Sequence, residues 1–211
     1  MRATRPSGAA RAVALVAAAA LALAGCANQG TPDAGKCETV SAPLSDVPTR
    51  TDQEPKMRLP VPPGWERTTK NDNESIRFAI RNNTLTAEDF TPTAVITLQQ
   101  VSTRTGKPEK VLQGQSDQLA EKLKLTDMKA TPTAVCGAPA LSSSYVAPEV
   151  ALGPKLPKIP PRTATSLATA YRAGDTYYVA TLTVQTTKPD NPTYQQDSAT
   201  ILKGFQLLPP K

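Results

Sequence analysis

The sequence contains no histidine among its 211 residues, and only 4% of them are aromatic. Histidine is the commonest general base near neutral pH, the usual partner of a catalytic serine or cysteine, and the commonest metal ligand. The chain also lacks a phosphate-binding glycine loop, a calcium-loop motif and a Gly-x-Ser-x-Gly elbow. We therefore expect that the protein is not an enzyme and that it binds no metal and no cofactor.

The chain also lacks an apolar run of about 20 residues, the length that a transmembrane helix needs. Its one sustained apolar run covers residues 12–23 and follows three arginines. A basic start, a short apolar core and small residues before a cleavage point are typical of a secretory signal peptide. The run ends in Leu23-Ala24-Gly25-Cys26, which resembles the lipobox of bacterial lipoproteins.

From this motif we expect residues 1–25 to be a signal peptide and Cys26 to begin the mature chain. A diacylglyceryl group on the Cys26 sulfur would then anchor the protein on the outer face of the bacterial cytoplasmic membrane. The alternative is an ordinary secreted protein with a chance cysteine near its cleavage site. The formal net charge is +6, but three of these charges are signal-peptide arginines, so +3 remains. With no basic cluster elsewhere, nucleic acid is not an expected partner.

Three cysteines are present, and the lipobox accounts for one of them. Cys37 and Cys136 remain, and an even number of cysteines in an oxidising compartment favours a disulfide. The alternative is two free thiols or a redox pair, although their separation is unlike a Cys-x-x-Cys motif. Residues 26–55 are rich in Thr, Ser, Pro, Asp and Gly and show no apolar periodicity, so we expect a flexible tether there.

The remaining residues, 56–211, have the patterns of a single α+β domain. Alternating apolar residues predict strands, and Pro60 favours an edge position for the first of them. A four-residue apolar period after Pro108 and an Asn191-Pro192 start predict two helices. The expected strands span 57–61, 75–81, 93–102, 128–135, 139–146, 163–172 and 176–187, and the first helix spans 107–125. This order favours a central antiparallel sheet flanked by helices.

Residues 148–161 contain five prolines and four aliphatic residues, so they can form neither a helix nor a central strand. Two interpretations of this segment stay open, and the first is a semi-rigid lid over an apolar cavity. The alternative is a surface loop that packs its own aliphatic side chains against the sheet. The residues that we expect to contact a ligand are Leu152, Leu156, Ile159, Tyr145 and Tyr178.

Several short sequences occur in the order found in one known family. They are Val61-Pro62-Pro63-Gly64-Trp65, the Gly-Ala-Pro-Ala step at 137–140, the strand at 175–187 and the helix ending at 201–205. Together they resemble the mycobacterial LpqN-type lipoproteins over residues 56–208. The resemblance implies a Mog1/PsbP-like α/β/α sandwich. It also implies a place in the cell envelope, contacts with lipid transport machinery and binding of trehalose-type glycolipids. The proline-rich segment at 148–161 departs from the family.

We therefore expect an envelope lipoprotein that binds an amphiphilic lipid or glycolipid, as a carrier or accessory factor in envelope lipid transport. The alternative function is a protein-interaction adaptor. In that case the same sandwich presents a surface to a membrane transporter and binds no small molecule.

Overall fold

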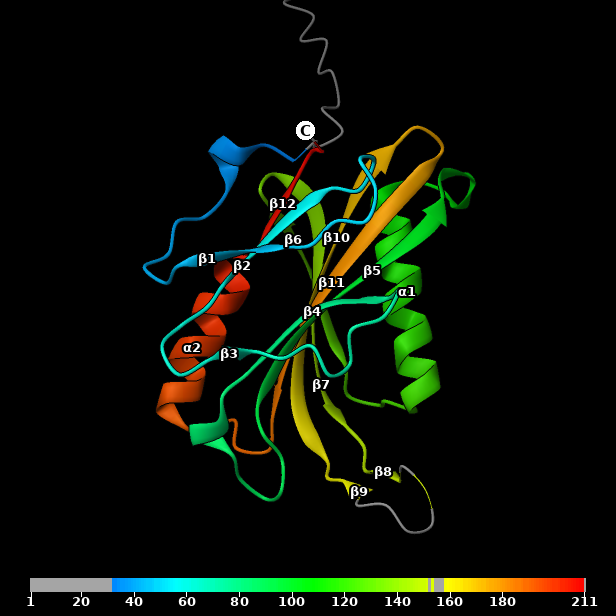
Figure 1. Ribbon diagram of the computed structural model, residues 1–211. Helices are drawn as coiled ribbons and strands as arrows, with labels where there is room; N and C mark the ends of the chain where they lie inside the picture. Colours follow the sequence, from blue (N-terminus) through cyan, green and yellow to red (C-terminus); the bar gives the residue numbers. More distant parts are fainter. Residues whose placement is uncertain (1–31, 152, 154–157, 211) are drawn as a thin grey trace, which may run out of the picture.

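The computed structural model describes residues 32–151, 153 and 158–210. Its centre is a seven-stranded antiparallel sheet in the order β3-β4-β5-β11-β10-β7-β6. Helix α1 (Pro108–Leu123) lies on one side of this sheet, and helix α2 (Pro192–Lys203) lies on the other (Figure 1). The expected α+β class, with a central antiparallel sheet flanked by helices, is confirmed.

Most of the sequence-predicted strands are present in the large sheet. Its strands are β3 (Glu66–Arg67), β4 (Ile76–Arg81), β5 (Thr93–Ser102), β6 (Lys129–Val135), β7 (Ala138–Ala147), β10 (Arg162–Ala173) and β11 (Thr176–Thr186). A second sheet contains β1 (Leu44–Val47), β2 (Lys56–Pro60) and β12 (Gln206–Leu208). The short elements are η1 (Ala34–Lys36), η2 (Asn83–Leu85), η3 (Thr103–Thr105), β8 (Val150–Ala151) and β9 (Lys158–Ile159).

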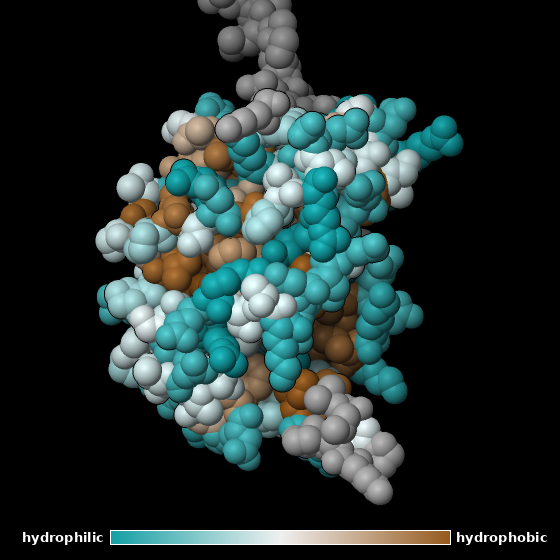
Figure 2. Space-filling view, viewed as in Figure 1, coloured by the Kyte–Doolittle hydropathy of each residue, from teal (hydrophilic) through white to brown (hydrophobic). Residues whose placement is uncertain are grey.

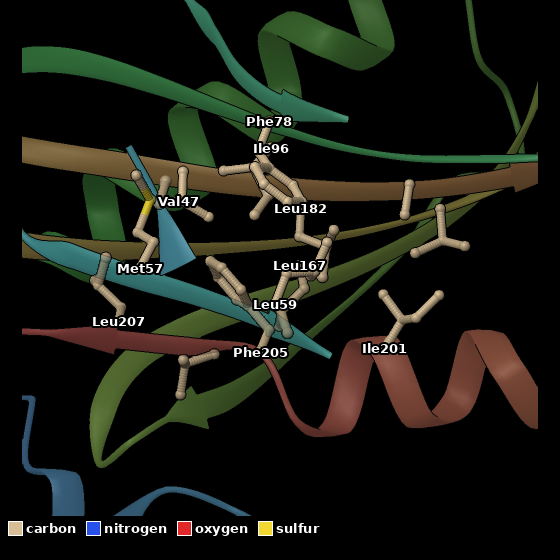
Figure 3. Packing of buried hydrophobic residues seen from close by; sticks show 14 of the residues in the cluster. Val47, Met57, Leu59, Phe78, Ile96, Leu167, Leu182, Ile201, Phe205 and Leu207 are labelled. Carbon is tan, nitrogen blue, oxygen red and sulfur yellow. The ribbon is translucent and has the colours of Figure 1, made fainter. Parts of the chain in front are cut away.

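The alternation along the strands gives the large sheet two different faces. On β11, Tyr178, Ala180, Leu182 and Val184 lie on one face and are at most 4% exposed. Side chains of the small sheet and of α2, among them Met57, Leu59, Ile201 and Leu207, pack against that face (Figure 3). Burial of each large aliphatic side chain contributes about 1.5–3 kcal/mol, so this face forms the main core.

Both predicted helices are present: α1 ends at Leu123, two residues before its predicted bound at 125, and α2 begins at the predicted Asn191-Pro192 step. Pro108 occupies the first turn of α1, where its missing N–H is not needed, and Lys124 ends that helix in the left-handed conformation. The Asn191 side chain caps α2 by accepting a hydrogen bond of 3.0 Å from the backbone N–H of Tyr194. The β6–β7 hairpin turns at Cys136 and Gly137, which both have the positive φ of a type I′ turn.

The predicted tether is wrong from residue 32 onward, because residues 32–55 pack on the domain. Cys37 forms the expected disulfide with Cys136, and the backbone N–H of Asp33 donates to the Cys136 carbonyl over 2.8 Å. Val47 in β1 is 4% exposed. The domain therefore begins well before residue 56. Strand β2, predicted at an edge, lies between β1 and β12, because β12, which is distant in sequence, pairs with its second side.

A buried ion pair fixes the loop before β2. Glu54, which is 3% exposed, accepts hydrogen bonds of 2.6 and 3.1 Å from the Arg77 guanidinium. The backbone N–H of Arg50 donates to the same carboxylate over 2.8 Å. Two partners thus compensate the buried charge of Glu54. In the part of the chain that the structure describes, no helix is long and apolar enough to cross a bilayer.

Candidate functional site

The face of the large sheet that lies toward α1 carries hydroxyl groups where the opposite face carries aliphatic side chains. On β11 this face presents Thr181 and Thr183, which alternate with the buried core residues of the same strand. Thr97 on β5, Ser166 on β10 and Ser143 on β7 belong to the same surface. The sheet therefore offers α1 a polar floor beyond the apolar patch of Leu141, Ala170 and Val179.

Helix α1 packs tightly on this floor only near its start. Val111 and Leu112 are buried in a small cluster with β7, β10 and β11 residues. Toward the end of the helix, Leu119 and Leu123 are only partly buried, against a cluster that contains Tyr145. Apolar side chains of an amphipathic helix do not pack closely against a polar sheet face. A groove therefore remains between the second half of α1 and the sheet.

This groove between α1 and the sheet has a volume of about 270 Å³. Its lining residues are Thr97, Gln99, Leu112, Gln115, Ser116, Gln118, Leu119, Lys122, Leu141, Ser143, Tyr145, Ser166, Ala168, Thr181 and Thr183. Figure 2 shows a recessed apolar strip between polar side chains on the side of the molecule where α1 lies. The groove thus combines an aliphatic wall with a hydroxyl-bearing floor.

The hydroxyl groups of the floor hydrogen-bond to one another. The Ser166 hydroxyl is 3.0 Å from the Thr183 hydroxyl and 3.2 Å from that of Tyr145. The Ser116 hydroxyl on α1 is 3.4 Å from that of Ser143, which is long for a bond between hydroxyls. Each hydroxyl donates one hydrogen bond and accepts two, so unused capacity remains for a polar ligand.

The groove has little charge of its own. Lys122, an exposed residue of α1, is the charged residue among the described residues that line it, and none of them is acidic. An uncharged interior with aliphatic and hydroxyl surfaces matches the two parts of an amphiphile.

A second hollow of about 500 Å³ lies next to the groove, and Tyr145 contributes to the walls of both. Its apolar lining includes Leu123, Leu125, Met128 and Val146. Val146 is 63% exposed and is the one large apolar side chain classed as exposed in the described part of the chain. Apolar surface therefore continues past the end of α1.

A third hollow, of about 470 Å³, lies near the disulfide. It is lined by Lys36, Glu38, Leu167, Lys203 and Phe205 together with residues of the β6–β7 hairpin. Two of these, Lys203 and Glu38, approach each other to 3.7 Å. Because Leu167 belongs to the main core, this hollow lies on the sheet face away from α1 and is separate from the groove.

The structure brings one of the five predicted ligand residues into the groove. Tyr145, 8% exposed, reaches the floor through its bond to Ser166. Tyr178 does not line the groove, because it is buried in the main core on the opposite face of the sheet. Ile159 is half-buried in β9, where it pairs with Val150. Leu152, Leu156 and the predicted lipidation site Cys26 lie outside the described residues.

Sequence reasoning missed the floor of the groove. Thr97, Ser143, Ser166, Thr181 and Thr183 occupy the polar positions of alternating strands. That pattern predicts a half-buried strand but does not say what covers its polar face. The available signal was the apolar stripe of α1, which needs a sheet face to pack against. A helix whose apolar stripe must lie over a polar strand face predicts a groove between the two.

No family model matches the chain, and no curated protein sequence matches it. Among solved structures it is similar to LpqN, described as involved in cell envelope biogenesis of Mycobacterium tuberculosis. The TM-score is 0.58 at 17% identity over 79% of this chain and 91% of LpqN. The Saccharomyces cerevisiae Ran-binding protein Mog1p and a Mog1 mutant each give 0.46 at 17% identity. Each match covers 79% of this chain, and 96% and 97% of the two Mog1 chains. The chain therefore has an LpqN-like fold.

Proposed function

We propose that this protein is a lipid-anchored component of the bacterial cell envelope that binds an amphiphilic lipid or glycolipid. It acts as a carrier or accessory factor in envelope lipid transport. The observation that carries this proposal is the groove between α1 and the sheet, with its aliphatic wall and hydroxyl-bearing floor. The LpqN-like fold supports the envelope role, since LpqN is involved in envelope biogenesis.

The groove suits an amphiphile because its two surfaces differ in polarity. Leu112, Leu119 and Leu141 provide contacts for an alkyl chain, which gains about 25 cal/mol per Å² of apolar surface removed from water. The hydroxyls of Ser166 and Thr183 provide partners for hydroxyls of a head group, such as a trehalose-type sugar. A volume of about 270 Å³ is near the lower end of ligand pockets, so part of a long ligand would extend outside.

Binding rather than catalysis fits the chemistry of these hydroxyls. A nucleophilic serine needs an adjacent general base, and the chain has no histidine. Among the described residues, the side-chain partners of the Ser166 hydroxyl are the hydroxyls of Tyr145 and Thr183, and neither a carboxylate nor a lysine hydrogen-bonds to it. We therefore propose a binding protein that is not an enzyme.

The anchor sets how far the domain reaches from the membrane. If Cys26 carries the acyl chains, ten residues lie between it and Cys37, and the eleven steps of an extended chain span at most about 40 Å. The disulfide to Cys136 then holds the turn between β6 and β7 within about that distance of the bilayer. This placement favours ligands drawn from the membrane surface, or exchange with a membrane transporter.

Native mass spectrometry of the protein purified without detergent tests this proposal. The full chain carries Cys26→Ser, which removes the acceptor of the anchor, and is exported from an actinobacterial host. We expect a co-purifying lipid, or one-to-one uptake of an alkyl trehaloside added below its micellar concentration. Ala168→Phe, which places a ring in the groove, should abolish the complex without lowering the melting temperature by more than a few degrees.

Ala130→Phe is the matched control, because Ala130 is an exposed residue of the edge strand β6 and does not line the groove. This variant should bind as the parent does. A clean apo mass with no uptake of any amphiphile would contradict the carrier function and favour the adaptor. Binding that survives Ala168→Phe would place the ligand elsewhere.

A further inference from the structure

The groove floor leads toward a half-buried arginine, Arg162, that has no acidic partner among the described residues. Arg162 begins β10, and Ala164, Ser166 and Ala168 follow it on the same face of the sheet because strand residues alternate. We propose that the amphiphile carries an anionic head group, a carboxylate or a phosphate, that binds to the Arg162 guanidinium. This inference rests on the proposed function and adds the chemical class of the ligand.

Hydrogen bonds place the guanidinium beside the floor. Its Nε donates to the side-chain oxygen of Gln185 over 2.7 Å, and Gln185 in turn donates to the Thr93 hydroxyl over 3.0 Å. Gln185 lies two residues beyond Thr183 on the same face of β11, which is about 7 Å along the strand. The charged group therefore lies at the end of the row of hydroxyls.

The Arg162 charge is only partly compensated by the protein. Within the described residues it forms no ion pair, and its Nη1 is 3.5 Å from the Pro160 carbonyl oxygen, too far for a strong hydrogen bond. Its guanidinium carbon lies 5.6 Å from the centre of the Phe90 ring. Burial lowers the pKa of Arg162, against a smaller opposing effect of Tyr145, yet an arginine remains charged at neutral pH.

This environment complements an anion in both charge and geometry. The two Nη atoms of a guanidinium form a planar fork that matches carboxylate and phosphate oxygens. Because the described lining of the groove contains no acidic residue, nothing there repels an anionic head group. Lys122 on α1 adds a second positive charge at the rim. With the head group at Arg162, an alkyl chain extends along Leu119 and Leu112.

Amphiphiles with one chain length and different head groups test the inference. Dodecanoate, dodecyl phosphate and the neutral dodecyl maltoside are titrated calorimetrically, each below its micellar concentration, into the full chain carrying Cys26→Ser. We expect at least one of the two anions to bind tenfold or more tightly than the maltoside, the size of effect that one charge-assisted hydrogen bond gives. The two anions separate a free fatty acid from a phospholipid as the source of the ligand.

The variants separate anion recognition from a structural role. Arg162→Gln should weaken anion binding at least tenfold and leave maltoside binding unchanged, whereas Arg162→Lys should restore part of the anion affinity. Arg172→Gln is the matched control, because Arg172 is an exposed residue of the same strand. It should change nothing.

Three results would contradict either the inference about Arg162 or the proposed function. Equal affinity for anions and maltoside, with no effect of Arg162→Gln, overturns the inference but leaves the proposed function standing. An equal loss of all three ligands in Arg162→Gln also overturns it, because Arg162 then only supports the fold. If no amphiphile binds the parent chain, the proposed function itself fails.

Discussion

Removing the disulfide tests how the segment before β1 is joined to the rest of the domain. Cys37 and Cys136 are 99 residues apart in sequence, so their bond closes a large loop in the unfolded chain. The perturbation is the pair Cys37→Ser and Cys136→Ser, made in a chain that already carries Cys26→Ser. The chain with Cys26→Ser alone is the control.

The expected loss follows from the loop length. In the chain-entropy model, a loop of this size stabilises the folded state by about 4.7 kcal/mol, because it restricts the unfolded chain. For a domain of 150–250 residues, each kcal/mol corresponds to about 2–4 °C in melting temperature. We therefore expect the melting temperature to fall by about 9–19 °C.

Urea unfolding followed by circular dichroism measures the free energy, and calorimetry gives the melting temperature. The hydrogen bond between Asp33 and Cys136 and the pairing of β1 with β2 remain possible in the variant, so the sheet itself should persist. A loss below about 1 kcal/mol, with an intact disulfide verified in the control by peptide mapping, would refute the reasoning. Contacts other than the disulfide would then hold the residues before β1 against the domain.

Three further changes test the packing of the domain. Glu54→Gln should lower the unfolding free energy by about 3–5 kcal/mol in urea, because it leaves the Arg77 charge buried without a counterion. Gly204→Ala should lower the unfolding free energy by about 1–3 kcal/mol, because the added Cβ would lie 2.5 Å from a methyl of Val40. An unchanged urea midpoint would show that residue 40 moves freely. Burial raises the pKa of Tyr194 above its usual 10.0, so above that pH the unfolded chain loses this proton while the folded one keeps it. Stability should therefore fall more steeply with alkaline pH in the parent than in Tyr194→Phe, and identical slopes would contradict this burial.

The sequence predicted the long strands well because each has one buried face. Residues 93–102 alternate over ten positions, and β5 spans Thr93–Ser102 as expected. Strand β1 has only four residues, and β12 has three, so neither shows a usable period. Both gain their stability from pairing with β2, which is distant from β12 in sequence. Such pairing cannot be deduced from local pattern.

The groove was harder to predict than the fold, for a physical reason. Alternation reports that one face of a strand is buried, but a threonine on the other face can meet water, a helix or a ligand equally well. Thr181 and Thr183 acquire their role only because α1 lies over them. Tyr177 and Tyr178 show the same limit of the pattern. Both are buried although they lie on opposite faces of β11, so neither face of the strand is exposed at this point.

Photo-crosslinking with a diazirine-bearing alkyl amphiphile tests most directly whether the groove between α1 and the sheet holds the ligand. The full chain with Cys26→Ser is labelled at low amphiphile concentration, and the modified residues are mapped by mass spectrometry. We expect labels on the groove lining, with Leu119 and Ala168 among the modified residues. Labels confined to the hollow around Phe205, or spread evenly over the exposed surface, would contradict it.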